Sequence, residues 1–501
     1  MLSTFLLIPL LGAIILALWP QESQVQSLAK GIASLVVLWT VYALSLFQTG
    51  QAQLQMGEFL PWLPNLGLNY ALAVDGLSMP LLALSSSLTW IAIFSSPAQL
   101  DRPRLYYSLI FLVNIGVSGS LLAQNLLLFF LFYELELIPF YLLVSIWGGE
   151  RKGYAATKFL LYTALSGILI LMGFLGLTWL GEGSSFDYSS LDTTTIPQGL
   201  QLILLTILLL GFGIKTPLVP LHTWQPDVYV EASPPVAILL GGVLAKLGTY
   251  GLIRFGLELF PDTWNLVAPG LAIIGTVSVI YGAMSAIAQS DVKRMVAYSS
   301  IGHMGYILVA AAAGNTLSLT GAITQMVSHG LILALLFHLL GIVEAKVGTR
   351  DLNRLNGLMN PIRGLPLTSA LLVLAGMASA GIPGLVGFIA EYLVFQGSFA
   401  RFPIPTLLCI ISSGLTAVYF VILINRTCFG RLDSHAAYYP KVTFAEQAPS
   451  LLLMASILFL GLQPLWLTQW SESTSAAIVA QIRSAPMAAA LSSTAPTLPQ
   501  G

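Results

Sequence analysis

The sequence predicts an all-α polytopic membrane protein with about 14 transmembrane helices. Of its 501 residues, 56% are hydrophobic and only 8% are charged, whereas soluble domains carry about 25% charged residues. So few polar side chains cannot cover the water-facing surface of a soluble enzyme of this length, and that class is excluded. The 20 Lys and Arg against 21 Asp and Glu also leave no basic face for a nucleic acid.

Apolar stretches of membrane-crossing length recur along the chain. A helix needs about 20 apolar residues to cross the hydrocarbon. The predicted spans are 2–19, 28–47, 76–96, 104–123, 125–147, 154–181, 199–230, 233–257, 264–289, 292–313, 316–346, 366–396, 404–429 and 450–470. The first stretch lacks a basic N-terminal region and a small-residue cleavage site, so we expect a retained helix rather than a signal peptide. The Ser, Thr, Ala and Pro-rich segment 471–501 is expected to be a disordered polar tail outside the membrane.

The basic residues are distributed unequally between the two sets of loops. With 14 spans, the loops after odd-numbered helices and the adjoining helix ends hold 15 Lys and Arg, and the opposite side holds 3, which are Arg254, Arg401 and Arg483. By the positive-inside rule the first set faces the cytoplasm. Both termini are therefore expected on the lumenal or periplasmic side.

Two predicted spans contain helix-breaking residues. Span 7 holds Pro217 and Pro220, and span 12 holds Pro383 between Gly381 and Gly384. Proline removes a backbone donor, and irregular backbone at membrane depth is tolerated only where protein or water surrounds it. Interrupted helices at corresponding places in two halves indicate an ion site in a transporter. We therefore expect two inverted five-helix repeats with broken helices 7 and 12. The chain then divides into 1–103 (helices 1–3), 104–257 (helices 4–8), 258–430 (helices 9–13), 431–470 (helix 14) and the tail 471–501.

Five charged residues lie well inside predicted spans, namely Glu134, Glu136, Lys215, Lys246 and Glu391. An ionisable side chain at the centre of a membrane helix costs about 2.5–3.5 kcal/mol, so it is a functional candidate by default. A lysine with a movable carboxylate partner can exchange a proton near physiological pH, and Lys215 lies at a helix break. Each also has a structural alternative, such as a lysine that ties two helices together. Residues two apart on a helix point about 200° away from each other, so spacing leaves open which glutamate faces Lys215.

The histidines are the expected bridge between these charges. Histidine is the side chain that carries protons near neutral pH, and His222, His303 and His329 fall in the middle spans. The alternative for each is a hydrogen-bonded core histidine. The set lacks the cysteine and clustered carboxylate partners of a metal site, and no dinucleotide or phosphate-loop motif is present. The pattern predicts a proton relay with no metal and no cofactor in this chain.

Three motifs carry a family resemblance, running from Phe132 to Pro139, from Lys215 to Asp227 and from Asp291 to Gly305. With them, residues from about 70 to 430 resemble the antiporter-like subunits of respiratory complex I. A glutamate rather than a lysine at the span 12 site resembles the NuoM/NdhD type, the chain 4 subunit. The Tyr-Glu-Leu-Glu-Leu-Ile-Pro form of the first motif resembles the cyanobacterial and plastid NdhD branch.

The resemblance implies a proton-pumping subunit of the photosynthetic NDH-1 complex in the thylakoid membrane, or in the plasma membrane. Its partners would be lipids and the other membrane-arm subunits, including neighbouring antiporter-like subunits. That complex oxidises ferredoxin or NAD(P)H and reduces plastoquinone, and the plastoquinone and iron–sulfur clusters belong to partner subunits.

The resemblance also implies residue roles. By the family pattern Glu134 is the acid that modulates Lys215, so the loss of Glu136 is expected to be the milder change. Lys246 is the central relay lysine and Glu391 is the terminal site. His222, His303 and His329 match family histidines near the central axis.

One position departs from the family pattern, and three alternatives stay open. The family commonly has a histidine shortly after the Pro-Asp of span 7, where this chain has Tyr229. A divergent chain of this kind is a candidate for the isoforms that serve CO2 uptake. A subunit of an Mrp-type sodium/proton antiporter or of a membrane-bound hydrogenase shares the same core. A non-pumping scaffold subunit is the third alternative, although the presence of all key charges argues against it.

Overall fold

The structure of the chain is a computed structural model that describes residues 1–181, 185–432 and 438–493. The first part contains α1 (Thr4–Leu18), α2 (Glu22–Leu46), β1 (Gln55–Leu63), the 3-10 turn η1 (Pro64–Leu66), β2 (Leu68–Val74), α3 (Ser78–Phe94), α4 (Pro103–Leu122), α5 (Leu126–Leu135), α6 (Leu137–Trp147) and α7 (Lys152–Leu180). The middle part contains the 3-10 turn η2 (Tyr188–Ser190), α8 (Gln198–Lys215), α9 (Trp224–Glu231), α10 (Pro234–Leu239), the π-helix η3 (Leu240–Leu244), α11 (Ala245–Gly251), the π-helix η4 (Leu252–Leu257) and α12 (Pro261–Ile287). The last part contains α13 (Val292–Ala313), α14 (Thr316–Val347), α15 (Pro366–Ser379), α16 (Val386–Phe399), α17 (Pro403–Cys428), α18 (Phe444–Leu462) and α19 (Leu465–Ser493).

The predicted all-α polytopic architecture is confirmed. Among the described residues, 11 helices are long and apolar enough to cross a membrane, and α1, α3, α15 and α16 are shorter apolar helices. The helical boundaries fall within a few residues of most predicted span boundaries, because a run of apolar residues of this length forms a helix that satisfies its own backbone hydrogen bonds in lipid. The total of 14 spans stays a prediction.

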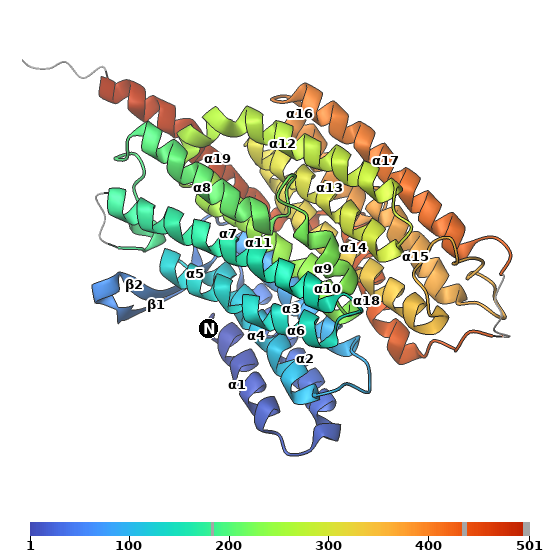
Figure 1. Ribbon diagram of the computed structural model, residues 1–501. Coiled ribbons are helices and arrows are strands. Elements are labelled where there is room, and N and C mark those ends of the chain that lie inside the picture. The colour runs from blue at the N-terminus through green and yellow to red at the C-terminus, as the bar shows by residue number, and fades with distance from the viewer. Residues whose placement is uncertain (182–184, 433–437, 494–501) are drawn as a thin grey trace, which may run out of the picture.

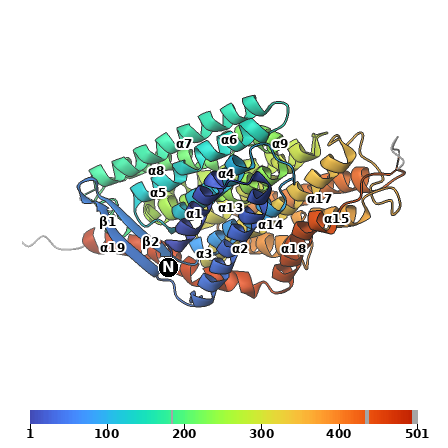
Figure 2. The same cartoon turned by 90° about the horizontal axis from the view of Figure 1, so that it is seen from below.

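Two helical runs lie at the centre of the bundle. One is the run from α10 to η4, residues 234–257, which we name span 8, and the other is α14; the apolar windows of both are buried along their whole length. In Figure 1, α14 runs behind α13 and lies between the α12 and α17 side of the bundle and the N-terminal helices. Figure 2 shows α7 and α8 on the face opposite α2 and α18. The residues in these apolar stretches are therefore shielded from both lipid and water.

The predicted interruptions are present in both broken spans. Helix α8 ends at Lys215 and α9 begins at Trp224, with a non-helical stretch between them. Helix α15 ends at Ser379 and α16 begins at Val386, and between them Gly381 has φ 69° and Gly384 has φ 93°. Side chains other than glycine rarely adopt such angles, which explains two glycines at this break.

A β-hairpin and a C-terminal helix are present that the sequence did not predict. Strands β1 and β2 pair antiparallel in a two-stranded sheet between α2 and α3. The expected disordered tail is wrong as far as residue 493, because α19 occupies Leu465–Ser493; residues 494–501 lie outside the described residues. Helix α19 packs on α14, and Thr474 accepts a hydrogen bond from the Gly76 amide through Oγ1 at 3.0 Å. Small and hydroxyl side chains allow such close packing between membrane helices.

Candidate functional site

A buried ion pair joins the end of α8 to the junction between α5 and α6. Lys215 Nζ lies 2.6 Å from Glu136 Oε1, and the two side chains are 1% and 0% exposed. The ammonium group also lies 3.9 Å from the centroid of the Tyr133 ring, at the distance of a cation–π contact. Glu136 Oε2 is buried and has no hydrogen-bond partner among the described residues. The pair is thus held without the full set of hydrogen bonds that would lock it.

The ion-pair partner of Lys215 in this structure is Glu136, whereas the family resemblance implies Glu134 as the acid that modulates this lysine. The reason is local. Pro139 has no N–H for the Leu135 carbonyl, and the helix is interrupted at Glu136, which separates α5 from α6. Glu134 instead lies against Gly167 of α7, where the missing side chain leaves room for its carboxylate. Its part in the relay stays a prediction.

Lys246 lies in α11, a seven-residue helix between two π-helical segments of span 8. Its side chain is 2% exposed. Nζ lies 2.7 Å from His329 Nδ1 of α14 and donates to the Gly241 carbonyl one turn earlier. The ammonium group therefore has one fixed backbone partner and one partner that can itself exchange a proton.

From His329 the polar contacts continue through α13 to α16. The rings of His329 and His303 have centroids 5.2 Å apart, and His303 Nδ1 lies 3.9 Å from Glu391 Oε1. Ser413 donates to Glu391 Oε2 at 2.6 Å. His303, His329 and Glu391 line one small cavity. We name the residues Lys246, His329, His303 and Glu391 the buried relay line.

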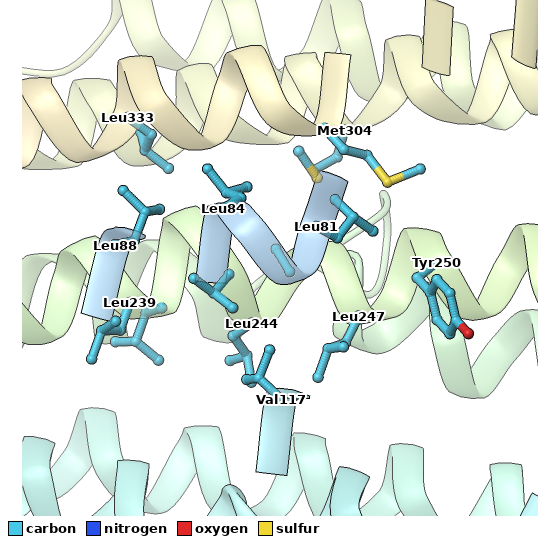
Figure 3. Close-up of a cluster of buried hydrophobic side chains, with 14 of the residues drawn as sticks. Leu81, Leu84, Leu88, Val117, Leu239, Leu244, Leu247, Tyr250, Met304 and Leu333 are labelled. Carbon is cyan, nitrogen blue, oxygen red and sulfur yellow. The ribbon is translucent and has the colours of Figure 1, made fainter. Parts of the chain in front are cut away.

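The ion pair and the buried relay line are separate in this structure. No hydrogen bond or ion pair joins Lys215 to Lys246 within the described ranges. Instead a small apolar void beside Lys246 is lined by Leu81, Leu84, Val117, Leu121, Val243 and Leu247. Figure 3 shows leucines of α3 and span 8 meeting at this place. Movement of a proton between the two groups needs a rearrangement or the admission of water.

His222 lies outside both groups. Its ring packs edge-on against Tyr281 of α12, with centroids 4.7 Å apart, and its Nδ1 is buried with no partner among the described residues. The bridge between Lys215 and Lys246 expected at His222 is therefore absent from the hydrogen bonds and ion pairs of this conformation. Its role as a carrier stays a prediction.

The comparisons with known proteins assign the family. A family model described as NADH:quinone oxidoreductase/Mrp antiporter, TM matches residues 123–416. NAD(P)H-quinone oxidoreductase chain 4 1 of Synechococcus sp. (strain JA-2-3B'a(2-13)) is 40% identical over 495 residues, which cover 96% of this chain and 93% of that protein. The chain belongs to the NADH:quinone oxidoreductase/Mrp antiporter family. The family resemblance predicted from the three motifs is confirmed.

Other relatives of this antiporter-family chain extend the match. NAD(P)H-quinone oxidoreductase chain 4 2 of Thermosynechococcus vestitus is 38% identical over 523 residues, covering 99% of this chain and 97% of that protein. A chain in the structure of respiratory complex I from Thermus thermophilus with bound NADH superposes with a TM-score of 0.87 and 26% identity, covering 96% of this chain and all of that one. A chain of the Mrp complex from Dietzia sp. superposes with a TM-score of 0.86 at 21% identity, covering 96% of this chain and 98% of that one, which shows a shared fold.

This antiporter-family chain also has a buried charge cluster that the sequence did not predict. Arg254 pairs with Asp75 and lies 2.9 Å from Glu258, and Tyr188 donates to Glu258 at 2.7 Å. Arg254 was counted as a loop charge, but its side chain is only 6% exposed. The spacing of four between Arg254 and Glu258 was the available signal, since such residues are neighbours on one helix face. This cluster connects span 8 to the start of α3, and loss of one partner would leave a buried charge unpaired at a cost of about 3–5 kcal/mol.

Proposed function

We propose that the chain is a proton-translocating membrane subunit of a photosynthetic NDH-1 complex, a NAD(P)H or ferredoxin–plastoquinone oxidoreductase. In this proposal the electron transfer takes place in partner subunits and this chain moves protons. The observation that carries the proposal is the buried relay line, in which a lysine, two histidines and a glutamate follow one another across four helices. The relatives named NAD(P)H-quinone oxidoreductase chain 4 support the choice of complex.

The ion pair of Lys215 and Glu136 is proposed to act as the gate. Breaking a buried pair leaves an uncompensated charge and costs about 3–5 kcal/mol. Moving one charge across 100 mV takes about 2.3 kcal/mol. Because the two quantities are of the same size, a conformational signal that opens this pair is on the scale needed to drive one proton step. Lys246 and Glu391 would then be the central and terminal sites, with His329 and His303 as carriers between them.

Two inverted repeats, residues 104–257 and 258–430, are proposed to supply the two halves of the path. The interruptions after Lys215 and before Val386 support this division, because Lys215 and Glu391 each lie close to the break of its own half. In a transporter built this way, broken helices place ion sites near the middle of the membrane.

A sodium/proton antiporter subunit is the main alternative, because a chain of the Mrp complex shares the fold. The two assignments predict different partners. When the chain is tagged in its native membrane and the intact complex is isolated under mild detergent, we expect subunits with flavin or iron–sulfur sites and plastoquinone reductase activity to copurify. Mass spectrometry of that complex identifies the partner subunits. Recovery of the chain with other antiporter subunits and no redox subunit would overturn the proposal. A hydrogenase subunit would copurify with a metal-containing hydrogenase instead.

The membrane and the orientation are also proposed. We assign the chain to the thylakoid membrane and both termini to the lumenal side, supported by the cyanobacterial relatives and by the 15-to-3 distribution of basic residues. A protease-cleavable tag at either end should survive protease added to the cytoplasmic face of sealed vesicles. Cleavage of either tag from that face would contradict the orientation and the count of 14 spans. Assignment to a CO2-uptake form stays a prediction from the sequence.

A further inference from the structure

The hydroxyl group of Tyr229 is attached to the backbone that holds Lys246. Tyr229 lies in α9 and is fully buried. Its hydroxyl donates to the Leu240 carbonyl at 3.1 Å. A side chain at Gly241 would come within 3.2 Å of the Tyr229 ring, so the ring lies directly against this glycine. Tyr229 therefore contacts two consecutive residues of the π-helical segment η3.

The backbone of η3 explains why the Gly241 carbonyl is available to Lys246. In a regular α-helix the amide N–H of residue 245 would bind the carbonyl of residue 241. Here the Ala245 N–H binds the Leu240 carbonyl instead, which is the wider spacing of a π-helix. The Gly241 carbonyl is thereby released from that amide, and Lys246 Nζ donates to it.

We propose that Tyr229 is a positioning residue for Lys246. The hydroxyl and the Ala245 N–H both bind the Leu240 carbonyl, so the hydroxyl holds the π-helical turn that releases the Gly241 carbonyl. The ring keeps Gly241 in place. Together they fix the backbone partner of the Lys246 ammonium group and leave its other side to His329. This inference rests on the proposed function, because it assigns Tyr229 a role only if Lys246 carries protons.

Tyr229 differs from a histidine at this position in its ionisation. An ordinary phenol keeps its proton up to about pH 10, so Tyr229 donates one constant hydrogen bond and does not load or release a proton in the physiological range. Among the described residues, His329 is the titratable side chain in direct contact with Lys246, and His303 and Glu391 follow behind it. Lys246 thus exchanges its proton on the His329 side.

The test replaces Tyr229 with phenylalanine in the complete, tagged complex. Tyr229→Phe removes only the hydroxyl, so assembly and electron transfer should be retained. This chain's share of the protons moved per electron, which is the part lost in Lys246→Met, should fall by about 2- to 12-fold, the equivalent of one hydrogen bond. The loss should deepen toward alkaline pH, where the ammonium form of Lys246 depends most on its carbonyl partner. Because the ratio is taken per electron, a variant that merely assembles less leaves it unchanged.

The matched control is Tyr188→Phe, which also removes a buried hydroxyl, here one that binds Glu258 and the Arg254 carbonyl. Among the described residues no side-chain hydrogen bond or ion pair joins that cluster to the Lys246 ammonium group. The proton-to-electron ratio of this control should equal that of the wild type. Tyr229→His, which restores an N–H donor, should pump better than Tyr229→Phe. A wild-type ratio and pH profile in Tyr229→Phe, or a histidine variant no better than the phenylalanine variant, would overturn the positioning role. Normal pumping by Lys246→Met would overturn the proposed function instead, so the two failures are distinguishable.

Discussion

Replacing Lys246 with methionine should abolish proton translocation through this chain while leaving the complex assembled. Methionine matches the length and apolar stem of lysine, and the site is already enclosed by apolar side chains of α3 and span 8. The variant removes the ammonium group from its contacts with His329 and the Gly241 carbonyl, so the buried relay line loses its first member. Quenching of a pH-sensitive dye in sealed vesicles, driven by the native electron donor, measures the outcome.

A peripheral lysine provides the control for this variant. Lys30 lies on α2 with its ammonium group 5.4 Å from the Phe94 ring centroid, outside the buried relay line. Lys30→Met removes one lysine charge just as Lys246→Met does, and it should pump normally. Equal pumping by the two assembled variants would remove Lys246 from the path.

The second large effect is expected at the ion pair, where Glu136→Gln should impair pumping more than Glu134→Gln. Glutamine at position 136 removes the ion-pair partner of the buried Lys215 ammonium group. Leaving this buried charge unpaired costs about 3–5 kcal/mol. Glutamine at position 134 changes a carboxylate that faces Gly167 and is not in the pair. Glu134→Gln is therefore the matched control for Glu136→Gln, because it makes the same chemical change two residues away.

The measurement is proton translocation per electron in each assembled variant, with blue-native electrophoresis to establish assembly. The order expected from the family resemblance was the opposite, with Glu134 as the modulating acid. If Glu134→Gln is the more severe variant, the Lys215–Glu136 pair represents one conformational state, and Lys215 pairs with Glu134 during proton translocation.

Much of the fold could be predicted because it depends on runs of one kind of residue. The lengths of the apolar runs gave the helical boundaries, and Pro217, Pro220 and Pro383 gave both interruptions. Helix α19 was missed because its serines and threonines suggest a polar tail when counted by composition, although Ser471, Thr474 and Ser475 are buried in the structure.

The candidate site could be predicted only in part, because its side-chain partners depend on distant elements. Lys215, Lys246 and Glu391 stand out in any reading, since a charge in an apolar run is costly. The glutamate that pairs with Lys215 is set by the helix interruption at Glu136. Helical periodicity presupposes an uninterrupted helix, so it could not identify this partner. Asp75 and Arg254 are 179 residues apart, so no local pattern relates them.

Apolar side chains of α3, α4 and span 8 line the void beside Lys246 and insulate this site electrically. A charge has no favourable place in an apolar gap without water, so the chain cannot conduct continuously from one side of the membrane to the other. Each crossing has to be a separate event in which the gap is briefly bridged and then dries again. When electron transfer stops, the apolar barrier stays dry. Protons then do not leak back through this chain, and the membrane potential is maintained.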